Sequence, residues 1–383
     1  MRIPFNRPFM TPEALVYMRQ AYENGHLSGD GPFTKKCQSW LEARIGCKKA
    51  LLTHSGTAAL EMAAILADIR PGDEVIMPSF TFSSTANAFV MRGGVPIFVD
   101  IRPDTLNIDE TKIEAAITVK TKAIVAVHYA GISCQMDVIL AIAHQHNLLV
   151  IEDAAHSILC SYHGKNLGSI GDLAALSFHE TKTLQSGEGG ALLVNNPRLA
   201  ERAEIIREKG TNRSQFFRGE VDKYTWLDVG SSYLPSDLVA AFLLSQLESA
   251  ETIVKRRRLI WERYHTAFHD LERSGKVQRP FVPDFCEHTA HMYYLLLQDE
   301  WQRTRFLSCM KKRGVMATFH YLPLHESPAG RRFGRVNGPM NITVSVSGRL
   351  ARLPLWMGIE SSLDYIVDSA RSVILEEEKV AWT

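Results

Sequence analysis

A lysine in a glycine-rich segment is the residue of this sequence best placed for covalent chemistry. The segment SFHETKTLQSGEGG (177–190) holds Ser177, then Lys182, and ends in a glycine cluster. Apolar runs flank it, so we expect a turn between two buried strands. A lysine in a shaped, partly desolvated pocket has a lowered pKa, which supplies the neutral amine that a Schiff base requires. Taken alone, Lys182 is more typical of a solvated turn.

A pair of carboxylates follows another predicted strand. The run LLVIED (148–153) ends in Glu152 and Asp153. Ligands of open α/β sheets bind beyond the carboxyl ends of the strands, so a carboxylate there can be held against a cofactor. The simpler interpretation of Asp153 alone is a helix N-cap, a position that aspartate favours.

A third segment suits a phosphate group. In HSGTAAL (54–60), Gly56 and Thr57 fall where a helix is predicted to begin. The first backbone N–H groups of a helix have no partner within it and form a ready site for an anion. An ordinary Ser/Thr cap explains this fragment equally simply.

A fourth segment, PSFTFSSTANA (78–88), places Phe80 and Phe82 on a loop after a strand. An aromatic ring there can stack on a flat heterocycle, although either ring alone is more typical of the core. The four segments follow one another on consecutive units of one predicted sheet. Together they supply the phosphate anchor, ring stack, acid and amine that pyridoxal 5'-phosphate (PLP) requires.

The elements that must position these groups alternate along the chain, which predicts a mostly parallel sheet covered by helices on both faces. We expect strands at 49–54, 74–78, 95–101, 122–129, 148–153, 173–179 and 190–195. We expect helices at 57–69, 84–94, 136–147 and 197–210, the last closed by Gly210, and a long one from about 237 past 264. The remainder predicts strands at 291–298 and 315–323 and helices at 302–314 and 362–378.

These elements predict two domains. Residues 1–246 form a large ligand-binding domain of the α/β class, and residues 247–383 form a smaller C-terminal α/β domain. The boundary lies inside the long helix, whose first half is almost entirely apolar and whose second half is strongly charged.

Composition excludes several classes of function. The net charge of the 383 residues is +1 without a basic stripe, so we expect no nucleic-acid partner. No apolar run approaches the roughly 20 residues of a membrane span, and the N-terminus has no signal core. The six cysteines lack zinc-site spacing, which predicts reduced thiols, no metal and a cytoplasmic protein. A dinucleotide enzyme is disfavoured because no G-x-G-x-x-G follows the first strand.

The sequence resembles the DegT/DnrJ/EryC1/StrS sugar aminotransferases, which have the type I PLP fold of aspartate aminotransferase. The matching motifs are SGTAAL, PGDEVIMPSFTF, FVDIRPDTLNID, VHYAG, VIEDAAHS, SFHETK, GEGG, FHYLPLH and RLPLW. The resemblance implies that Lys182 carries PLP as a Schiff base and that Asp153 binds the pyridine nitrogen. It further implies cofactor contacts by other residues, namely His156 near the ring hydroxyl, Phe82 on the ring, and Gly56, Thr57 and Ser177 at the phosphate.

Segments 209–226 and 230–237 are similar to a narrower branch of this family. That branch uses L-glutamate to aminate C4 of dTDP-4-keto-6-deoxy-D-glucose, giving dTDP-4-amino-4,6-dideoxy-D-galactose, a precursor of enterobacterial common antigen. The resemblance implies a homodimer in which 209–226 reaches the partner's site. Many relatives have an asparagine that contacts the neighbouring subunit's cofactor phosphate, whereas this chain has Ser231–Ser232, and Ser232 is the candidate substitute. Candidates for the nucleotide-sugar are Arg213, Arg218, Lys223, Tyr321 and His325, and GHLSGDGPF (25–33) is a further candidate lining.

Other functions stay open at this stage. The amination could take place at C3 or on a UDP-linked sugar. Related sugar dehydratases typically have histidine in place of the cofactor lysine, which Lys182 disfavours. A PLP lyase or aldolase and a non-catalytic regulator that kept the fold are further alternatives.

Overall fold

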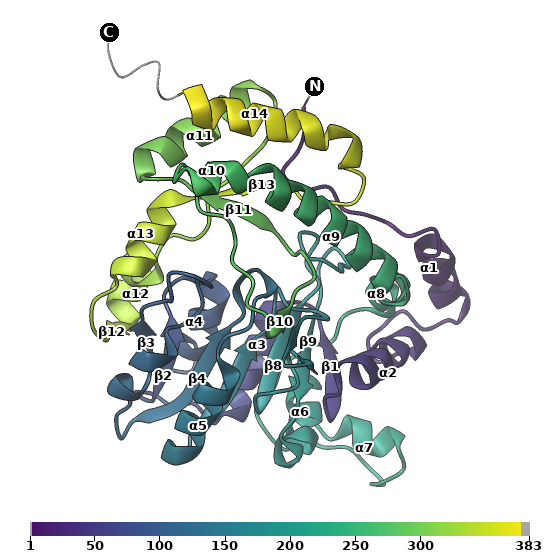
Figure 1. Ribbon diagram of the computed structural model, residues 1–383. Helices are drawn as coiled ribbons and strands as arrows, with labels where there is room; N and C mark the ends of the chain where they lie inside the picture. The colour runs from purple at the N-terminus through teal and green to yellow at the C-terminus, as the bar shows by residue number, and fades with distance from the viewer. Residues whose placement is uncertain (1, 377–383) are drawn as a thin grey trace.

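The centre of the molecule is an eight-stranded mixed sheet in the order β1-β9-β8-β5-β4-β2-β3-β12 (Figure 1). The computed structural model describes residues 2–376. Only β9 runs antiparallel to its neighbours, β1 and β8, so the predicted mostly parallel sheet is confirmed. The strands are β1 (Lys49–Thr53), β2 (Glu74–Pro78), β3 (Val95–Val99), β4 (Thr121–Val127), β5 (Leu149–Asp153), β8 (Leu173–Ser177), β9 (Gly190–Val194) and β12 (Arg335–Val336).

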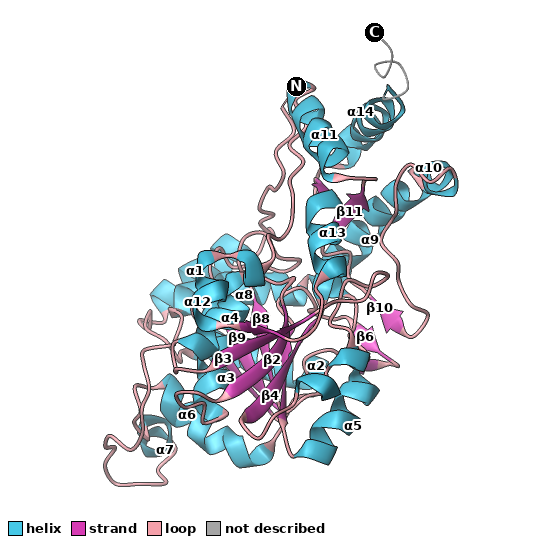
Figure 2. Cartoon of the chain, turned by 90° about the vertical axis from the view of Figure 1, so that its left-hand side faces the viewer, coloured by secondary structure: helices cyan, strands magenta, loops and turns pink. Residues whose placement is uncertain are grey.

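Helices cover both faces of this sheet (Figure 2) because its strands are apolar on both sides. One face packs against α3 (Gly56–Leu66), α4 (Ser83–Val90) and α6 (Ala200–Arg207). The opposite face packs against α2 (Pro32–Ile45) and α8 (Asp237–Glu248) near β1, and against α5 (Met136–His146) near β4. Alternate residues of each strand enter the two cores, which fixes the register of every strand.

The C-terminal part has its own hydrophobic core, as expected for a smaller α/β unit. The two-stranded sheet of β11 (Tyr293–Leu296) and β13 (Leu350–Leu353) packs against α9, α11 and α14. Ile3, near the N-terminus, joins this core and forms a bridge with Val315. The helices are α9 (Ala250–Ala267), α11 (Glu300–Lys312) and α14 (Leu363–Leu375), and residues 377–378 of the predicted last helix lie outside the described part.

The long helix predicted from residue 237 is two helices. The backbone of Ser249 leaves the helical region, and α9 starts in a new direction after it. Along α9, Ile253 packs on the sheet core and Ile260 on the C-terminal core. The start of α9 therefore contacts the core beside the sheet, and its later turns contact the C-terminal core. The domain boundary at 246 stays a prediction.

The strand predicted at 315–323 is wrong. The segment makes only isolated bridges, at Val315 and at Thr318, and β11 pairs with β13 instead. Phe319, Tyr321 and Leu322 of this segment line a cavity, so their apolar character does not reflect a sheet ladder. Pro323 also lacks the N–H that an extended ladder requires.

Helix α6 ends as its sequence predicts. Gly210 has a left-handed backbone (φ +75°), and its N–H donates to the carbonyl of Ile205. A Cβ at this position would lie 1.8 Å from the carbonyl oxygen of Asp228, so only glycine fits the turn that leads into α7.

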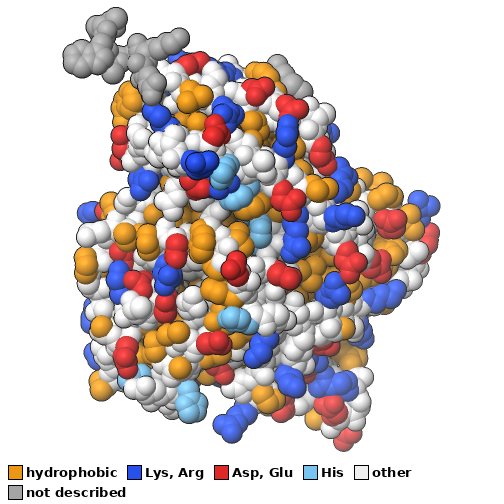
Figure 3. All heavy atoms as spheres, viewed as in Figure 1, with side chains coloured by type: hydrophobic (Ala, Val, Ile, Leu, Met, Phe, Trp, Pro, Cys, Tyr) orange, Lys and Arg blue, Asp and Glu red, His pale blue; other side chains and the backbone are white. Residues whose placement is uncertain are grey.

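The remaining helices are α1 (Ala14–Glu23), α7 (Arg213–Phe217), α10 (His269–Arg273), α12 (Pro328–Phe333) and α13 (Asn341–Arg349), and short strands are β6 (Ser161–Tyr162), β7 (Lys165–Asn166) and β10 (Cys286–Glu287). Within residues 2–376, no helix has the length and apolar character that a membrane crossing requires. On the face in Figure 3, basic and acidic side chains are intermixed. All six cysteines carry free thiols.

A buried carboxylate connects the sheet to the C-terminal part. Asp100, at the end of β3, accepts hydrogen bonds from the N–H groups of Ile342 and Thr343 (3.1 and 2.8 Å) and from the Thr343 hydroxyl (2.8 Å). Burial alone would raise the pKa of Asp100, but the hydrogen bonds from Thr343 and its neighbours outweigh it and lower the pKa. The ionised carboxylate therefore holds the first turn of α13 against the sheet.

Replacing this carboxylate with an amide is expected to destabilise the protein. Asp100→Asn removes the charge from several charge-assisted hydrogen bonds, which corresponds to about 1–3 kcal/mol of unfolding free energy near neutral pH. Folding lowers the pKa of Asp100. The difference in unfolding free energy between parent and variant is therefore fully present above about pH 4, near the unfolded pKa, and shrinks as the pH falls through the pKa of the folded state. Urea unfolding of both proteins across pH measures it.

Asp68→Asn is the matched control, because Asp68 forms an exposed ion pair with Arg70 and asparagine tolerates its left-handed backbone. Its stability is expected to stay within about 0.5 kcal/mol of the parent. Equal effects of the two substitutions would contradict the role given to Asp100.

Candidate active site

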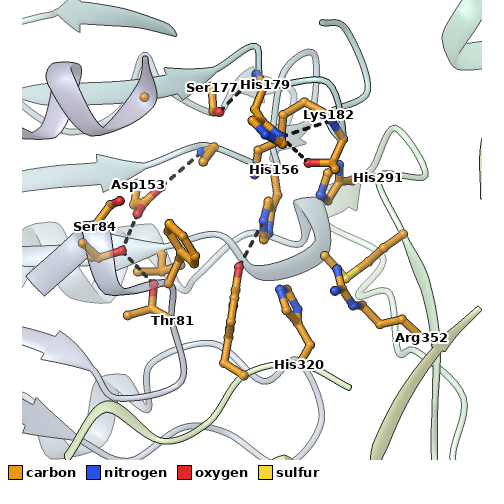
Figure 4. Close-up of a pocket in the computed structure, with 18 of the residues that line it drawn as sticks. Thr81, Ser84, Asp153, His156, Ser177, His179, Lys182, His291, His320 and Arg352 are labelled. Atoms are coloured by element: carbon orange, nitrogen blue, oxygen red, sulfur yellow. Dashed lines mark hydrogen bonds between the residues drawn. The ribbon is translucent and has the colours of Figure 1, made fainter. Parts of the chain in front are cut away.

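A cavity of about 640 Å³ opens at the carboxyl ends of the parallel strands (Figure 4). Its walls come from the turns after β5 and β8, from the first turns of α3 and α4, and from the C-terminal segments 318–322 and 352–355. Eight of the residues predicted from the sequence line it, namely Gly56, Thr57, Phe82, Asp153, His156, Ser177, Lys182 and Tyr321.

Lys182 lies in the turn between β8 and β9, as predicted. The turn is closed by backbone hydrogen bonds from Phe178 to Gly189 and from Glu180 to Gly187, each 2.8 Å. Burial lowers the pKa of Lys182 to about 8, a shift that the charge of Asp153 opposes and that of Arg352 reinforces. Roughly a tenth of the amine is therefore neutral at pH 7, far more than for a solvated lysine.

Asp153 points into the cavity from the end of β5 and is 6% exposed. The Thr85 hydroxyl donates to one carboxylate oxygen (2.7 Å), and the N–H of Ala155 donates to the other (3.2 Å). Since Thr85 donates its single proton there, the Thr81 hydroxyl must donate to Thr85 (2.8 Å). No helix begins at Asp153, so the simpler N-cap interpretation does not apply.

The neighbouring carboxylate faces the other way. Glu152 is fully buried and accepts the N–H groups of Gly168, Ile170 and Gly171 (2.7–2.8 Å). His128 Nδ1 accepts the N–H of Cys134, so its Nε2 carries the proton and donates to Glu152 (3.0 Å). These contacts anchor the end of β5.

A group of hydroxyl and backbone donors gathers at the start of α3. Ser55 caps the helix by accepting the N–H of Ala58, and Gly56 and Thr57 line the cavity after it. The hydroxyl groups of Thr57 and Ser84 lie 2.8 Å apart. A Cβ on Gly56 would lie 2.9 Å from that of Ser177, so glycine lets the helix start approach β8. This donor set fits a phosphate group.

Imidazole rings form the wall opposite Asp153. His156 stacks on His291 with 4.3 Å between ring centroids, and its Nε2 lies 3.4 Å from the Tyr321 hydroxyl. Burial, and secondly the charge of Lys182, holds the pKa of His156 well below its usual value, so the ring is neutral. Phe82 is 58% exposed at the cavity edge, 6.3 Å from the Tyr321 ring, and its stacking on a cofactor stays a prediction.

His325 lies outside the cavity lining. Its ring Nδ1 is 2.7 Å from the Ser79 hydroxyl, and its backbone N–H donates to the same oxygen. This pairing anchors the chain after 318–322 to the end of β2, and a contact of His325 with the sugar stays a prediction.

The predicted residues of 209–232 also lie outside the cavity of this chain, on a segment around α7 that projects from the body (Figures 1 and 2). Arg218 pairs with Glu204 and Glu220, and Arg213 lies over the ring of Phe217. Lys223 and Ser232 are exposed, as are most residues of 25–33. The resemblance implies that 209–226 reaches a partner's site, and that role stays a prediction.

Several polar residues of the cavity were missed from the sequence. Thr85 lies in the first turn of α4 and Thr81 precedes that helix, so no helical spacing indicated the pair. The other missed residues are Ser84, His179, His291, His320 and Arg352. All but His291 lie in motifs recognised in the sequence, where neighbouring residues were taken as the functional ones.

The lowered pKa of Lys182 predicts a pH dependence of its reactivity. Only the neutral amine attacks an acylating reagent, so roughly a tenth of Lys182 should be reactive at pH 7 and most of it at pH 9. The rate of its modification, followed by peptide mass, should therefore rise with a midpoint of about 8. Asp153→Asn removes a charge that raises this pKa and should move the midpoint lower. A midpoint near that of a solvated lysine would contradict the buried position.

Comparison with known proteins assigns the chain to a family of aminotransferases. The DegT/DnrJ/EryC1/StrS aminotransferase family matches residues 8–371. A spore coat polysaccharide biosynthesis protein of Bacillus subtilis is 35% identical, with 97% of each chain covered. GDP-perosamine synthase of Caulobacter vibrioides is 32% identical, with 98% of this chain and 99% of the relative covered.

A solved structure, described as a Streptococcus pneumoniae sugar aminotransferase in its PLP form, has a TM-score of 0.90 and 25% identity. The match covers 98% of this chain and 99% of the solved chain. The chain belongs to the DegT/DnrJ/EryC1/StrS aminotransferase family and is a PLP-dependent sugar aminotransferase.

Proposed function

We propose that this enzyme transfers the amino group of L-glutamate to C4 of dTDP-4-keto-6-deoxy-D-glucose, as a cytoplasmic homodimer. The product is dTDP-4-amino-4,6-dideoxy-D-galactose. The observation that carries the transaminase chemistry is Lys182, with its lowered pKa, in one cavity with Asp153 and the phosphate-binding groups of α3. Support for the substrate comes from segments 209–226 and 230–237, which are similar to the branch that uses it.

Lys182 is the group that carries the cofactor and moves the proton. PLP, when bound, supplies an electron sink that stabilises negative charge on the donor's Cα. The neutral Nζ of Lys182 takes the proton from that Cα and returns it on the cofactor side as the ammonium form. A pKa of about 8 suits both directions of this transfer at neutral pH.

The other polar groups of the cavity hold the cofactor in place. Asp153 would bind the pyridine nitrogen and keep a proton on it, and the Thr81–Thr85 pair holds the Asp153 carboxylate. Gly56, Thr57, Ser84 and Ser177 would bind the phosphate, because the Thr57 and Ser84 hydroxyls lie 2.8 Å apart and Gly56 approaches Ser177 in the cavity lining.

The same chemistry fits other keto-sugars linked to a nucleotide, and one relative is named for a GDP-linked sugar. A UDP- or GDP-linked keto-sugar, or amination at C3, is therefore the alternative that a substrate panel must include. A regulator without turnover is disfavoured because the lysine, acid and phosphate-binding groups all face one cavity.

The segment 209–229 supports the homodimer. It exposes large apolar side chains, among them Phe217 (68%), Trp226 (76%) and Leu227 (55%). Such side chains are rarely left in water on one projecting segment, and they mark an interaction surface. A partner subunit that covers them would bring Arg213 and Lys223 toward a shared site, where basic side chains suit a diphosphate.

Removal of the amine tests the transaminase chemistry. Lys182→Ala should lower turnover with L-glutamate and the dTDP-keto-sugar by about a thousandfold or more, because it removes both the covalent anchor and the proton carrier. Mass detection of the amino-sugar across dTDP-, UDP- and GDP-keto-sugars measures turnover and substrate preference together. Borohydride reduction should fix the cofactor on Lys182 in the parent.

Lys165→Ala, at an exposed lysine on β7, serves as the control and should keep the parent's rate. The proposal fails if Lys182→Ala retains full activity or if no keto-sugar of the panel is aminated. Preference for a UDP- or GDP-linked sugar would instead select the alternative substrate.

Disruption of the projecting apolar segment tests the homodimer. Trp226→Asp places a charge on its most exposed aromatic residue and should convert the dimer to a monomer at micromolar concentration, measured by light scattering after size exclusion. Trp301→Asp is the matched control, since Trp301 is 66% exposed on α11, and it should leave the mass unchanged. A parent protein that is monomeric would contradict the assembly.

A further inference from the structure

A second hollow, of about 510 Å³, lies apart from the cofactor cavity. Residues 274–285, which descend from α10 to β10 (Figure 1), form one wall, and the later turns of α9 form another. Its lining shares no residue with the lining of the cofactor cavity, so the transaminase chemistry leaves this hollow unexplained. Its volume lies within the range of small-molecule sites.

Aromatic rings line much of this hollow. Trp261 and His265 lie one helical turn apart on α9 and stack, with 4.4 Å between ring centroids. The ring of His288 meets that of Trp261 edge-on at 4.6 Å. Phe281 belongs to the wall formed by 274–285 and is 48% exposed, which leaves its ring open to a ligand. A flat, unsaturated ring can stack there.

Two of these rings carry N–H groups that the protein does not use. Burial lowers the pKa of His288 to about 4, so its ring is neutral. His288 Nδ1 accepts the N–H of Ala290 (3.2 Å), which places the proton of the ring on Nε2. Within residues 2–376, neither His288 Nε2 nor Trp261 Nε1 donates to an acceptor, and neither is closed off from solvent.

His265 adds a third N–H group of this kind. Burial, and secondly the charge of Arg279, lowers the pKa of His265 to about 4, so this ring is also neutral. Its Nδ1 is buried without a hydrogen-bond partner. Since a buried N–H without an acceptor is costly, the proton belongs on Nε2, which stays open. Three N–H donors on aromatic rings are therefore available around one hollow.

The charged side chains of the lining neutralise one another. Arg279 donates to Glu272 (2.7 Å), and Asp104 accepts two hydrogen bonds from Arg102 (3.0 and 2.9 Å). With both imidazole rings neutral, the described part of the lining carries no unpaired charge. The hollow therefore favours an uncharged ring that bears carbonyl oxygens over a phosphate or a carboxylate.

We propose that this hollow binds a pyrimidine base with two carbonyl groups, such as thymine, at a site separate from the catalytic one. Phe281 stacks on the base, and the N–H groups of the α9 rings and of His288 donate to its carbonyl oxygens. Gln278 Nε2 donates to the carbonyl of Pro103 (3.3 Å), which leaves the side-chain oxygen of Gln278 to accept the N–H of the base. Adenine stacks as well but has no carbonyl oxygen, so the hollow discriminates against it.

Photocrosslinking of the holoenzyme locates a bound base directly. 5-Iodouridine has the same two carbonyl groups and, on irradiation, forms adducts with aromatic side chains that it contacts. Peptide mass should place the adduct within residues 259–288. An excess of thymidine should prevent this adduct, whereas an equal concentration of adenosine should not.

Two variants test the contacts separately. His265→Phe keeps a ring on Trp261 and removes nitrogens that make no hydrogen bond in the described chain, so the melting temperature should not fall. The thymidine concentration that halves the adduct should rise about fivefold in this variant. It should rise at least about fivefold in Phe281→Ala, through lost stacking. Phe333→Ala, at a 40% exposed ring on α12 outside both linings, is the matched control and should keep the parent's value.

The outcomes separate this inference from the proposed function. Adducts only in the cofactor cavity, equal protection by adenosine, or the parent's affinity in a folded His265→Phe enzyme each overturn the inference. A raised KM for the nucleotide keto-sugar in Phe281→Ala overturns it too, because the hollow would then belong to the substrate site. A parent that binds thymidine here but aminates no keto-sugar overturns the substrate proposal alone, since crosslinking needs no turnover.

Discussion

The end of β5 is the position on which the active site depends, because two adjacent carboxylates there point to opposite sides of the sheet. Glu152 is anchored by backbone N–H groups and by His128, and side chains alternate along a strand, so its anchoring fixes the direction of Asp153. Burial alone would raise the pKa of Glu152, but its hydrogen bonds lower it. A buried, ionised and fully bonded neighbour thus aims the carboxylate that faces the cofactor.

The second constraint is the balance of charge inside the cavity. Lys182 is partly buried near one carboxylate and one guanidinium, which act on its pKa in opposite directions. Were Arg352 paired with a carboxylate of the protein, the amine would be protonated more readily and would attack less well. Among residues 2–376 Arg352 has no such partner, so its charge helps to keep the pKa of Lys182 low and the amine reactive.

The sequence predicted the sheet because apolar runs of strand length alternate with helical periods, and burial on both faces leaves no other arrangement. Lys182 and Asp153 were predictable because strand ends and glycine-rich turns are local features. His291, His320 and Arg352 were not, because their place depends on how the C-terminal part packs over the sheet. The same packing explains the error at 315–323, where side chains that line the cavity give the segment the apolar character of a strand.

The C-terminal part is therefore a component of the active site as well as a separate core. Arg352 is fixed by the pairing of β13 with β11 and by a backbone bridge to Thr318, whereas Lys182 is fixed by the sheet. The distance between the two cationic groups is set by contacts that join these bodies, such as Asp100 at the start of α13. A small rotation of one body would move the guanidinium relative to the amine and change the charge around it. Contacts far from the cavity can thus affect the pKa of Lys182.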